Sequence, residues 1–209
     1  MKRWILLIIL FVGMITAYNY LDAVQTKPKR VSLPEPQPGL KTDKPATLQP
    51  GRVVELQTSK GEIDFILFER DCPKTTKQIA KLVSAKAYDG VKFGRVEKNE
   101  LIQTDTAKKK APTLGLECLS KLNNVKGAVG MARTADINSA TSVFYILLEP
   151  KPSLDYEYTT FGRVIRGLDV AMSITKNDTI KHAVIRPLTP RDRKDFYAAL
   201  TAAVKREVD

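Results

Sequence analysis

The sequence has very few of the residues on which many active sites depend, with one histidine, His182, and two cysteines, Cys72 and Cys118. A serine or cysteine triad needs an imidazole beside its nucleophile, and His182 lies in a Val- and Ile-rich segment where nothing marks it as a base. So few ligands cannot assemble a zinc cluster, and no glycine-rich loop ends in Gly-Lys-Ser/Thr. We therefore expect neither metal ions nor other cofactors. Whether the two cysteines form a disulfide is left open.

The charge is unbalanced, with 34 basic against 23 acidic residues and a net charge of +11. Such an excess can indicate a nucleic acid or a lipid surface as partner. The densest basic run, Lys108–Lys110, stands beside Pro112 without interleaved aromatic residues. We interpret this run as a solvated loop and expect no nucleic-acid partner. The 209 residues, 43% of them hydrophobic, predict one substantial core, and we expect a monomer.

No charged residue occurs between Trp4 and Leu21, and Lys2 and Arg3 stand immediately before this stretch. As a helix it would be about 27 Å long, close to the hydrocarbon thickness of a membrane. We interpret residues 1–21 as a single-pass transmembrane anchor, with a cleaved signal segment as the alternative. The folded domain is then expected on the extracytoplasmic, periplasmic side of the cell membrane, or free in the periplasm after cleavage.

Two further segments flank the predicted folded domain. Residues 22–50 contain six of the twelve prolines and almost no apolar periodicity, which predicts an extended, Pro-rich linker. At the other end, residues 191–209 predict an amphipathic helix. Thr189 and Asp192 form a capping-box-like start, and Phe196 lies on an apolar face that we expect to pack on the domain.

Residues 51–190 open with two runs in which apolar and polar side chains alternate, and continue with further short strand-like segments separated by turn residues. This pattern predicts a closed β-barrel or a sandwich. A proline at a first helical position and an apolar stripe predict a helix from Pro73 to Ala85, and a second helix is expected from Gly167 to Thr175. Strands are predicted in two runs within 53–68 and at 91–96, 101–104, 128–133, 144–148, 160–164 and 183–188.

The most informative stretch is Phe93-Gly94-Arg95-Val96, followed eight residues after the arginine by Gln103. Both polar side chains lie in apolar, strand-like surroundings, where a charge needs either a partner or a function. Considered alone, Arg95 could be a barrel arginine held by a carboxylate, without a catalytic part. Further blocks follow at 127–132, 142–148 and 160–164.

In their order and spacing, these blocks resemble the cyclophilin family of peptidyl-prolyl isomerases over residues 51–190. The resemblance implies a mainly β fold, a closed eight-stranded antiparallel barrel capped by two helices, to which this sequence adds the transmembrane helix and the C-terminal helix. It implies proline-containing polypeptides as partners. Arg95 would donate a hydrogen bond to the proline nitrogen, and Gln103 would bind the peptide carbonyl. The implied substrate-binding residues are Phe93, Glu100, Leu101, Met131, Ala132, Tyr145, Leu154 and Tyr158.

Several positions depart from the family pattern. A carboxylate at Glu100, in place of a pocket phenylalanine, would lose hydration against a proline ring and could pair with Arg95. We therefore carry two hypotheses: a membrane-anchored prolyl isomerase that assists the folding of exported proteins, and a catalytically degenerate peptide-binding or scaffold module in the cell envelope. The other departures are Gly94, Thr104, Asp105, Val143, Tyr145 and Ser153.

Overall fold

A computed structural model describes residues 50–117 and 123–208 of the chain. The predicted anchor at residues 1–21, the linker up to residue 49 and Cys118 lie outside the described residues. Over the part that is described, no helix combines the length and the apolar composition that a membrane crossing requires.

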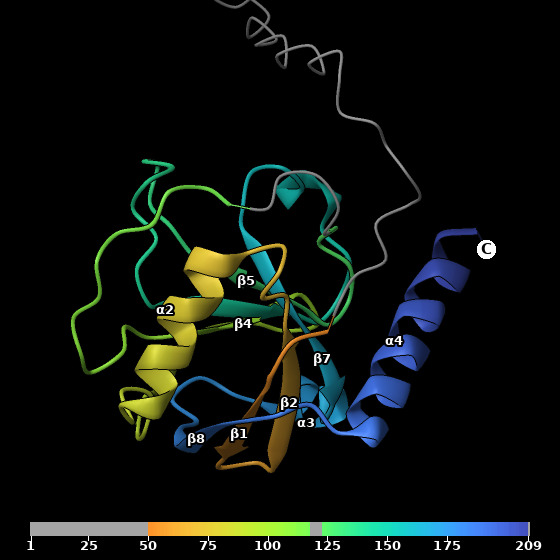
Figure 1. The fold of residues 1–209 in the computed structure, drawn as a ribbon, viewed down its shortest axis with the longest axis horizontal. Coiled ribbons are helices and arrows are strands. Elements are labelled where there is room, and N and C mark those ends of the chain that lie inside the picture. The colour runs from red at the N-terminus through yellow and green to blue at the C-terminus, as the bar shows by residue number, and fades with distance from the viewer. Residues whose placement is uncertain (1–49, 118–122, 209) are drawn as a thin grey trace, which may run out of the picture. The chain divides into compact units, whose positions relative to one another are not determined.

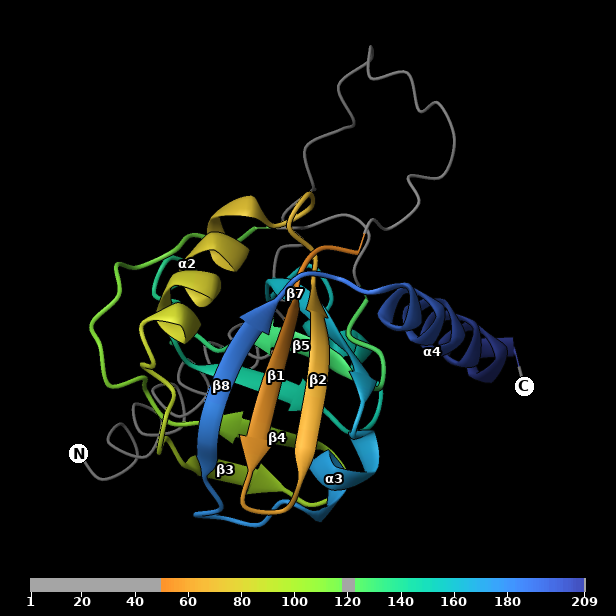
Figure 2. The ribbon, with the colours of Figure 1, turned by 60° about the horizontal axis from the view of Figure 1, so that its bottom comes forward.

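Eight strands form one antiparallel sheet in the order β3-β4-β6-β5-β7-β2-β1-β8 (Figures 1 and 2). Every predicted strand is present, and the ends differ from the predicted ones by at most three residues. Alternation located the first two strands, and short apolar segments between turn residues located the others. The strands are β1 (Val53–Thr58), β2 (Glu62–Leu67), β3 (Phe93–Glu97), β4 (Leu101–Thr104), β5 (Ala128–Met131), β6 (Phe144–Leu147), β7 (Thr160–Arg166) and β8 (Ile180–Arg186).

The sheet closes into a barrel because its two outer strands, β3 and β8, are joined beside their first residues. Lys92, directly before β3, forms an antiparallel bridge with Thr179, directly before β8. The backbone N–H of Phe93 donates to the carbonyl of Asp178, and that of Ile180 donates to the carbonyl of Val91, both over 2.8 Å. The predicted closed, eight-stranded antiparallel barrel is confirmed.

The barrel interior is filled by large apolar side chains. Phe65, Phe144 and Phe161 are almost completely buried, and the Phe65 ring centroid lies 5.9 Å from that of Phe144 and 6.2 Å from that of Phe161. Tyr88 is also buried, and its hydroxyl donates to the carbonyl of Ser142 over 2.7 Å. A buried phenol that finds such a partner packs without leaving a polar group unsatisfied. The interior is thus a rigid support for the loops around the barrel.

Two helices accompany the barrel where the sequence predicts them. α2 (Pro73–Ser84) has a proline at its first position and buries Ile79, Leu82 and Val83. α3 (Leu168–Ser173) is shorter than the predicted range. It begins after Gly167, whose φ of 74° and close approach to a neighbouring backbone carbonyl leave no room for a Cβ atom. A short 3₁₀ turn, η1 (Pro152–Leu154), precedes β7.

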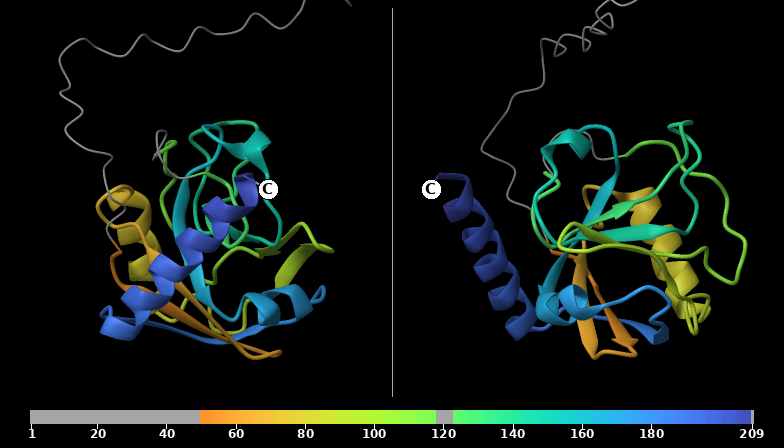
Figure 3. Two further views of the ribbon diagram at one scale, coloured as in Figure 1. Left: turned by 90° about the vertical axis from the view of Figure 1, so that its right-hand side faces the viewer. Right: turned by 180° about the vertical axis from the view of Figure 1, so that it is seen from behind.

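A third helix, α4 (Pro190–Val208), follows the last strand and runs along the outside of the barrel (Figure 3). The predicted capping box is present, because the Asp192 N–H donates to Thr189 Oγ1 over 3.2 Å and the Thr189 N–H donates to Asp192 Oδ2 over 2.8 Å. Phe196 is fully buried in an apolar cluster with Ile66 and Phe68. The helix therefore packs on the barrel through the apolar face that the sequence indicated.

Charged groups also tie α4 to the barrel. The buried carboxylate of Asp192 accepts hydrogen bonds from Arg186 Nη1 over 2.5 Å and from Arg166 Nη2 over 2.7 Å. Hydrogen bonding from the Arg186 guanidinium is the main reason why the pKa of Asp192 lies well below its usual range. Arg166 also donates to the buried Asp64 on β2. One ionic network therefore connects α4 with β2, β7 and β8.

Candidate active site

Arg95 on β3 and Gln103 on β4 lie side by side because they pair in the register of these adjacent strands. Arg95 Nη1 lies 3.5 Å from Gln103 Oε1, to which it donates. The register shifts between Phe93 and Arg95, so these side chains do not share a face although they are two residues apart. Phe93 is fully buried in the core, whereas 53% of the Arg95 side chain is exposed. The bulge thus turns the guanidinium outward.

Gly94, the residue at the bulge, lies against the side chain of Asp105, which is another departure from the family pattern. A Cβ atom at this position would overlap with the carboxylate of Asp105. The aspartate side chain therefore fills the space that a larger residue at position 94 would need. The absence of a side chain at Gly94 and the Asp105 carboxylate are therefore sterically matched.

A cavity of about 160 Å³ opens beside Arg95 and Gln103. Seven of the ten predicted site residues line it, although they come from β3, β4, β6, η1 and the segments after β5 and before β7. The barrel thus brings together residues that are far apart in the sequence. The lining consists of Arg95, Leu101, Gln103, Ala132, Arg133, Tyr145, Lys151, Leu154 and Tyr158.

One wall of this cavity is apolar and aromatic. Leu101 and Tyr145 are buried, and Leu154 and Tyr158 pack against the same cluster. The rings of Tyr145 and Tyr158 meet edge to face with centroids 6.2 Å apart. The Tyr145 hydroxyl donates to the buried Asn124 Oδ1 over 2.9 Å, and burial raises the pKa of Tyr145. The phenol therefore stays neutral, so the tyrosine is a mild replacement for phenylalanine.

Two carboxylates stand near Arg95, and the sequence indicated only one of them. Glu100 is exposed in the turn between β3 and β4 and accepts a hydrogen bond from Lys151, which lowers the pKa of Glu100. Glu97 holds the arginine instead, because its Oε1 accepts hydrogen bonds from Arg95 Nε over 2.8 Å and Nη2 over 2.5 Å. The sequence did offer a signal for Glu97, because it lies two residues after Arg95, and side chains two residues apart on a strand share a face.

Two further cations line the cavity, and the sequence did not single them out. The guanidinium of Arg133 lies 4.4 Å from the centroid of the Tyr158 ring, and its Nη2 lies 3.2 Å from Glu157 Oε2. Its position directly after Ala132 was a signal that could have found it. Lys151 also lines the cavity and forms an ion pair with Glu100. These two residues are far apart in the sequence, so no local pattern indicates their contact.

Three predicted substrate-binding residues do not line the cavity. Phe93 and Met131 are buried in the main core of the barrel, with 0% and 1% of their surface exposed. Glu100 lies outside the cavity but contacts its wall through Lys151. Phe93 therefore supports the strand that carries Arg95, and Met131 supports the end of β5, which Ala132 follows.

Among the described residues, one group of carboxylates has a spacing suited to a metal ion: Glu55, Glu62 and Asp64, with ligand atoms within 4.8 Å of one another. Arginines already neutralise two of its members, because Arg186 donates to Glu55 and Arg166 donates to Asp64. The group lies on β1 and β2, whereas Arg95 and its cavity lie on β3, β4 and β6. The cavity chemistry therefore does not involve this group.

Comparison with known proteins agrees with this geometry. The family model "Cyclophilin type peptidyl-prolyl cis-trans isomerase/CLD" matches residues 53–190. The chain is 32% identical over 154 residues to a probable peptidyl-prolyl cis-trans isomerase of Brucella suis, covering 66% of this chain and 78% of that protein. It is 35% identical over 147 residues to a peptidyl-prolyl cis-trans isomerase of Schizosaccharomyces pombe, covering 66% of this chain and 92% of that protein.

A solved structure shows the same barrel. The cyclophilin type peptidyl-prolyl cis-trans isomerase of Cryptosporidium parvum, crystallised in the presence of the dipeptide Ala-Pro, matches with a TM-score of 0.59 and 25% identity. The match covers 65% of this chain and 99% of that one. The chain therefore belongs to the cyclophilin-type peptidyl-prolyl cis-trans isomerase family and is an enzyme of that class.

Proposed function

We propose that this isomerase assists the folding of exported proteins, with residues 1–21 as its membrane anchor and Arg95 as the hydrogen-bond donor in catalysis. The observation that carries the catalytic part is the position of Arg95 beside Gln103 at the rim of a cavity that has one apolar, aromatic wall. The related Cryptosporidium structure, crystallised in the presence of Ala-Pro, supports a proline-containing peptide as the ligand. The charge-free stretch after Lys2 and Arg3 supports the anchor.

The chemistry requires no nucleophile, acid or base. A prolyl bond rotates slowly because resonance gives it partial double-bond character, with a barrier of about 18–20 kcal/mol. A guanidinium that donates to the proline nitrogen in the twisted state stabilises the localised lone pair and so lowers this barrier. Glu97 binds Nε and Nη2, which leaves donors on Nη1, the atom that faces Gln103. The apolar wall would hold the proline ring while the chain turns.

The catalytic part is tested by the cis-to-trans relaxation of short peptides that differ in the residue before proline. The purified full-length chain in detergent should accelerate this relaxation above the uncatalysed rate. A folded chain that accelerates none of the peptides would overturn the proposal.

The location is tested separately by fractionation of cells that produce the full-length chain. The protein should stay in the membrane pellet after a carbonate wash, and protease added to spheroplasts should degrade the domain. Protection from the protease until the inner membrane is lysed would contradict an extracytoplasmic domain.

Glu97 should orient Arg95 rather than withdraw it from the reaction. In Glu97→Gln the two charge-assisted hydrogen bonds to Nε and Nη2 are weakened, so the guanidinium is less well fixed. We expect kcat/KM to fall by about threefold to tenfold. Glu69→Gln is a matched control, because Glu69 forms a similar exposed pair with Arg52 outside the cavity. A gain of activity in Glu97→Gln would instead show that the carboxylate restrains the donor.

A further inference from the structure

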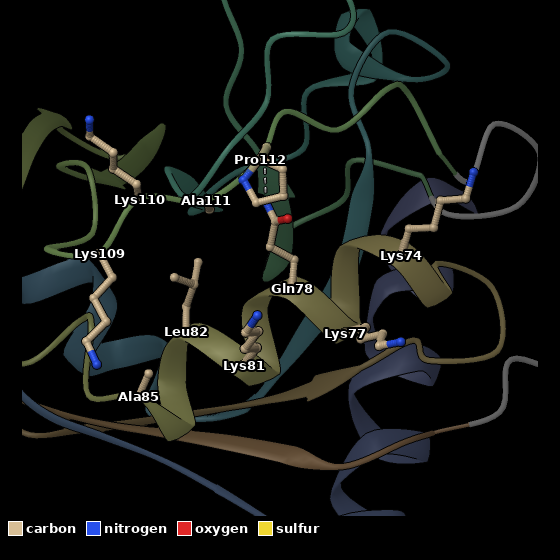
Figure 4. A pocket seen from close by; sticks show the side chains of 10 residues that line it. All are labelled: Lys74, Lys77, Gln78, Lys81, Leu82, Ala85, Lys109, Lys110, Ala111 and Pro112. Carbon is tan, nitrogen blue, oxygen red and sulfur yellow. Dashed lines mark hydrogen bonds between the residues drawn. The ribbon is translucent and has the colours of Figure 1, made fainter.

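A second and larger cavity, of about 350 Å³, lies between α2 and the loop that follows β4 (Figure 4). It shares no residue with the cavity beside Arg95. We call it the lysine groove, and its lining consists of Lys74, Lys77, Gln78, Lys81, Leu82, Ala85, Lys109, Lys110, Ala111 and Pro112.

Half of the groove's lining residues are lysines, and none is acidic. Lys74, Lys77 and Lys81 follow one another along α2, and Lys109 and Lys110 belong to the opposite loop. All five are exposed, and none forms an ion pair with a carboxylate in the described parts of the chain. Like charges at helical spacing repel one another. The groove therefore carries a positive potential that an anionic ligand would relieve.

The interior of the groove is apolar. Leu82 on α2 points toward Ala111 and Pro112 on the loop, between the side chains of Lys81 and Lys109 (Figure 4). This arrangement offers a hydrophobic contact at the centre and ammonium groups around it. A ligand that matches it carries an apolar group flanked by negative charges.

The walls of the groove are fastened to each other without a ligand. Gln78 Nε2 donates to the carbonyl of Pro112 over 3.0 Å and to that of Thr141 over 2.6 Å. At the other end of the loop, the backbone N–H of Lys108 donates to the carbonyl of Ala87 over 2.9 Å. Binding would thus not have to pay the entropy of ordering this loop.

We propose that the lysine groove binds an acidic polypeptide segment that places an apolar side chain against Ala111 and Pro112, above the buried Leu82, while its carboxylates pair with the surrounding lysines. The site is separate from the prolyl-isomerase cavity and would give the enzyme a second contact with partner proteins. Two contacts on one chain raise the effective concentration of a target at the catalytic cavity.

Charge disfavours occupants from this chain itself. The linker at residues 22–50 carries five basic against three acidic residues, and the whole chain carries +11. Neither the linker nor a second copy therefore complements five lysines. A flat anionic membrane would meet the ammonium groups but would not fill the hollow around Leu82, so a peptide fits better.

The test uses a fluorescent peptide, Glu-Glu-Leu-Glu-Glu, which lacks the proline that the catalytic cavity is proposed to bind. Its anisotropy is measured with the full-length chain in detergent at low and high salt. Binding should weaken by about tenfold in Lys81→Ser/Lys109→Ser and should weaken further at high salt. The Gln-Gln-Leu-Gln-Gln peptide should bind less well because it lacks the carboxylates. The Glu-Glu-Ser-Glu-Glu peptide should bind less well because it lacks the apolar side chain.

A matched control removes two charges from another helix. Arg193→Ser/Lys194→Ser lies on α4, on a different side of the barrel from α2 (Figures 1 and 2), and should leave peptide binding unchanged. Equal loss in both double variants would mean that only net charge matters and would overturn the proposal. So would lysine-dependent binding to phosphatidylglycerol vesicles without peptide binding. Isomerase activity on a short prolyl peptide should be unchanged in Lys81→Ser/Lys109→Ser, which separates this site from the catalytic one.

Discussion

Replacement of Arg95 by alanine should lower kcat/KM for a short prolyl peptide by about 100-fold to 1000-fold, the loss typical of removing one preorganised donor to a transition state. The guanidinium is about half exposed at the rim and contributes little to the core, so the free energy of unfolding should change by less than about 1 kcal/mol. Protease-coupled or direct relaxation kinetics measure the first quantity, and urea unfolding followed by circular dichroism measures the second.

Two variants make this result specific. Arg52→Ala removes another half-exposed arginine that is paired with a glutamate, but at the first strand and outside the cavity, so it should retain full activity. Arg95→Lys keeps the charge but loses the planar set of donors that reaches Glu97 and Gln103 together, so it should recover little. Arg95→Ala with full activity would exclude the guanidinium as the donor and would leave Gln103 and the apolar wall to explain catalysis.

Replacement of Phe196 by alanine should lower the free energy of unfolding by about 3–5 kcal/mol. Phe196 is fully buried against the outer face of the barrel, where its ring centroid lies 6.2 Å from that of Phe68. Truncation removes this burial and leaves a cavity between α4 and the strands. Urea unfolding of the full-length chain measures the change.

The neighbouring residue offers the control. Tyr197 lies on the same helix but is 42% exposed, so Tyr197→Ala should cost about 1 kcal/mol or less. A similarly small loss in Phe196→Ala would show that α4 docks through its ionic network rather than through its apolar face. Activity of the folded Phe196→Ala protein should be normal, because none of the residues that line the Arg95 cavity belongs to α4.

Local patterns were sufficient for most of the fold. Period-two alternation located the first two strands, and short apolar segments between turn residues located the other six. Pro73 marked the start of α2, and the Thr189–Asp192 capping box with Phe196 predicted a docked third helix. These features depend on neighbours a few residues apart, so the sequence alone could predict them. The spacing of Arg95 and Gln103 was informative for the same reason, because one short hairpin carries both.

Contacts between distant segments were decided by the tertiary structure. The pairing of Glu100 with Lys151 joins residues 51 positions apart, and it leaves Glu97 as the partner of Arg95. The run Lys108–Lys110 lies in an exposed loop, as predicted, but only the folded barrel sets Lys109 and Lys110 opposite the lysines of α2. Charge interactions depend on distance in space and on exposure to water. Both are fixed only when the strands close and bring these segments side by side.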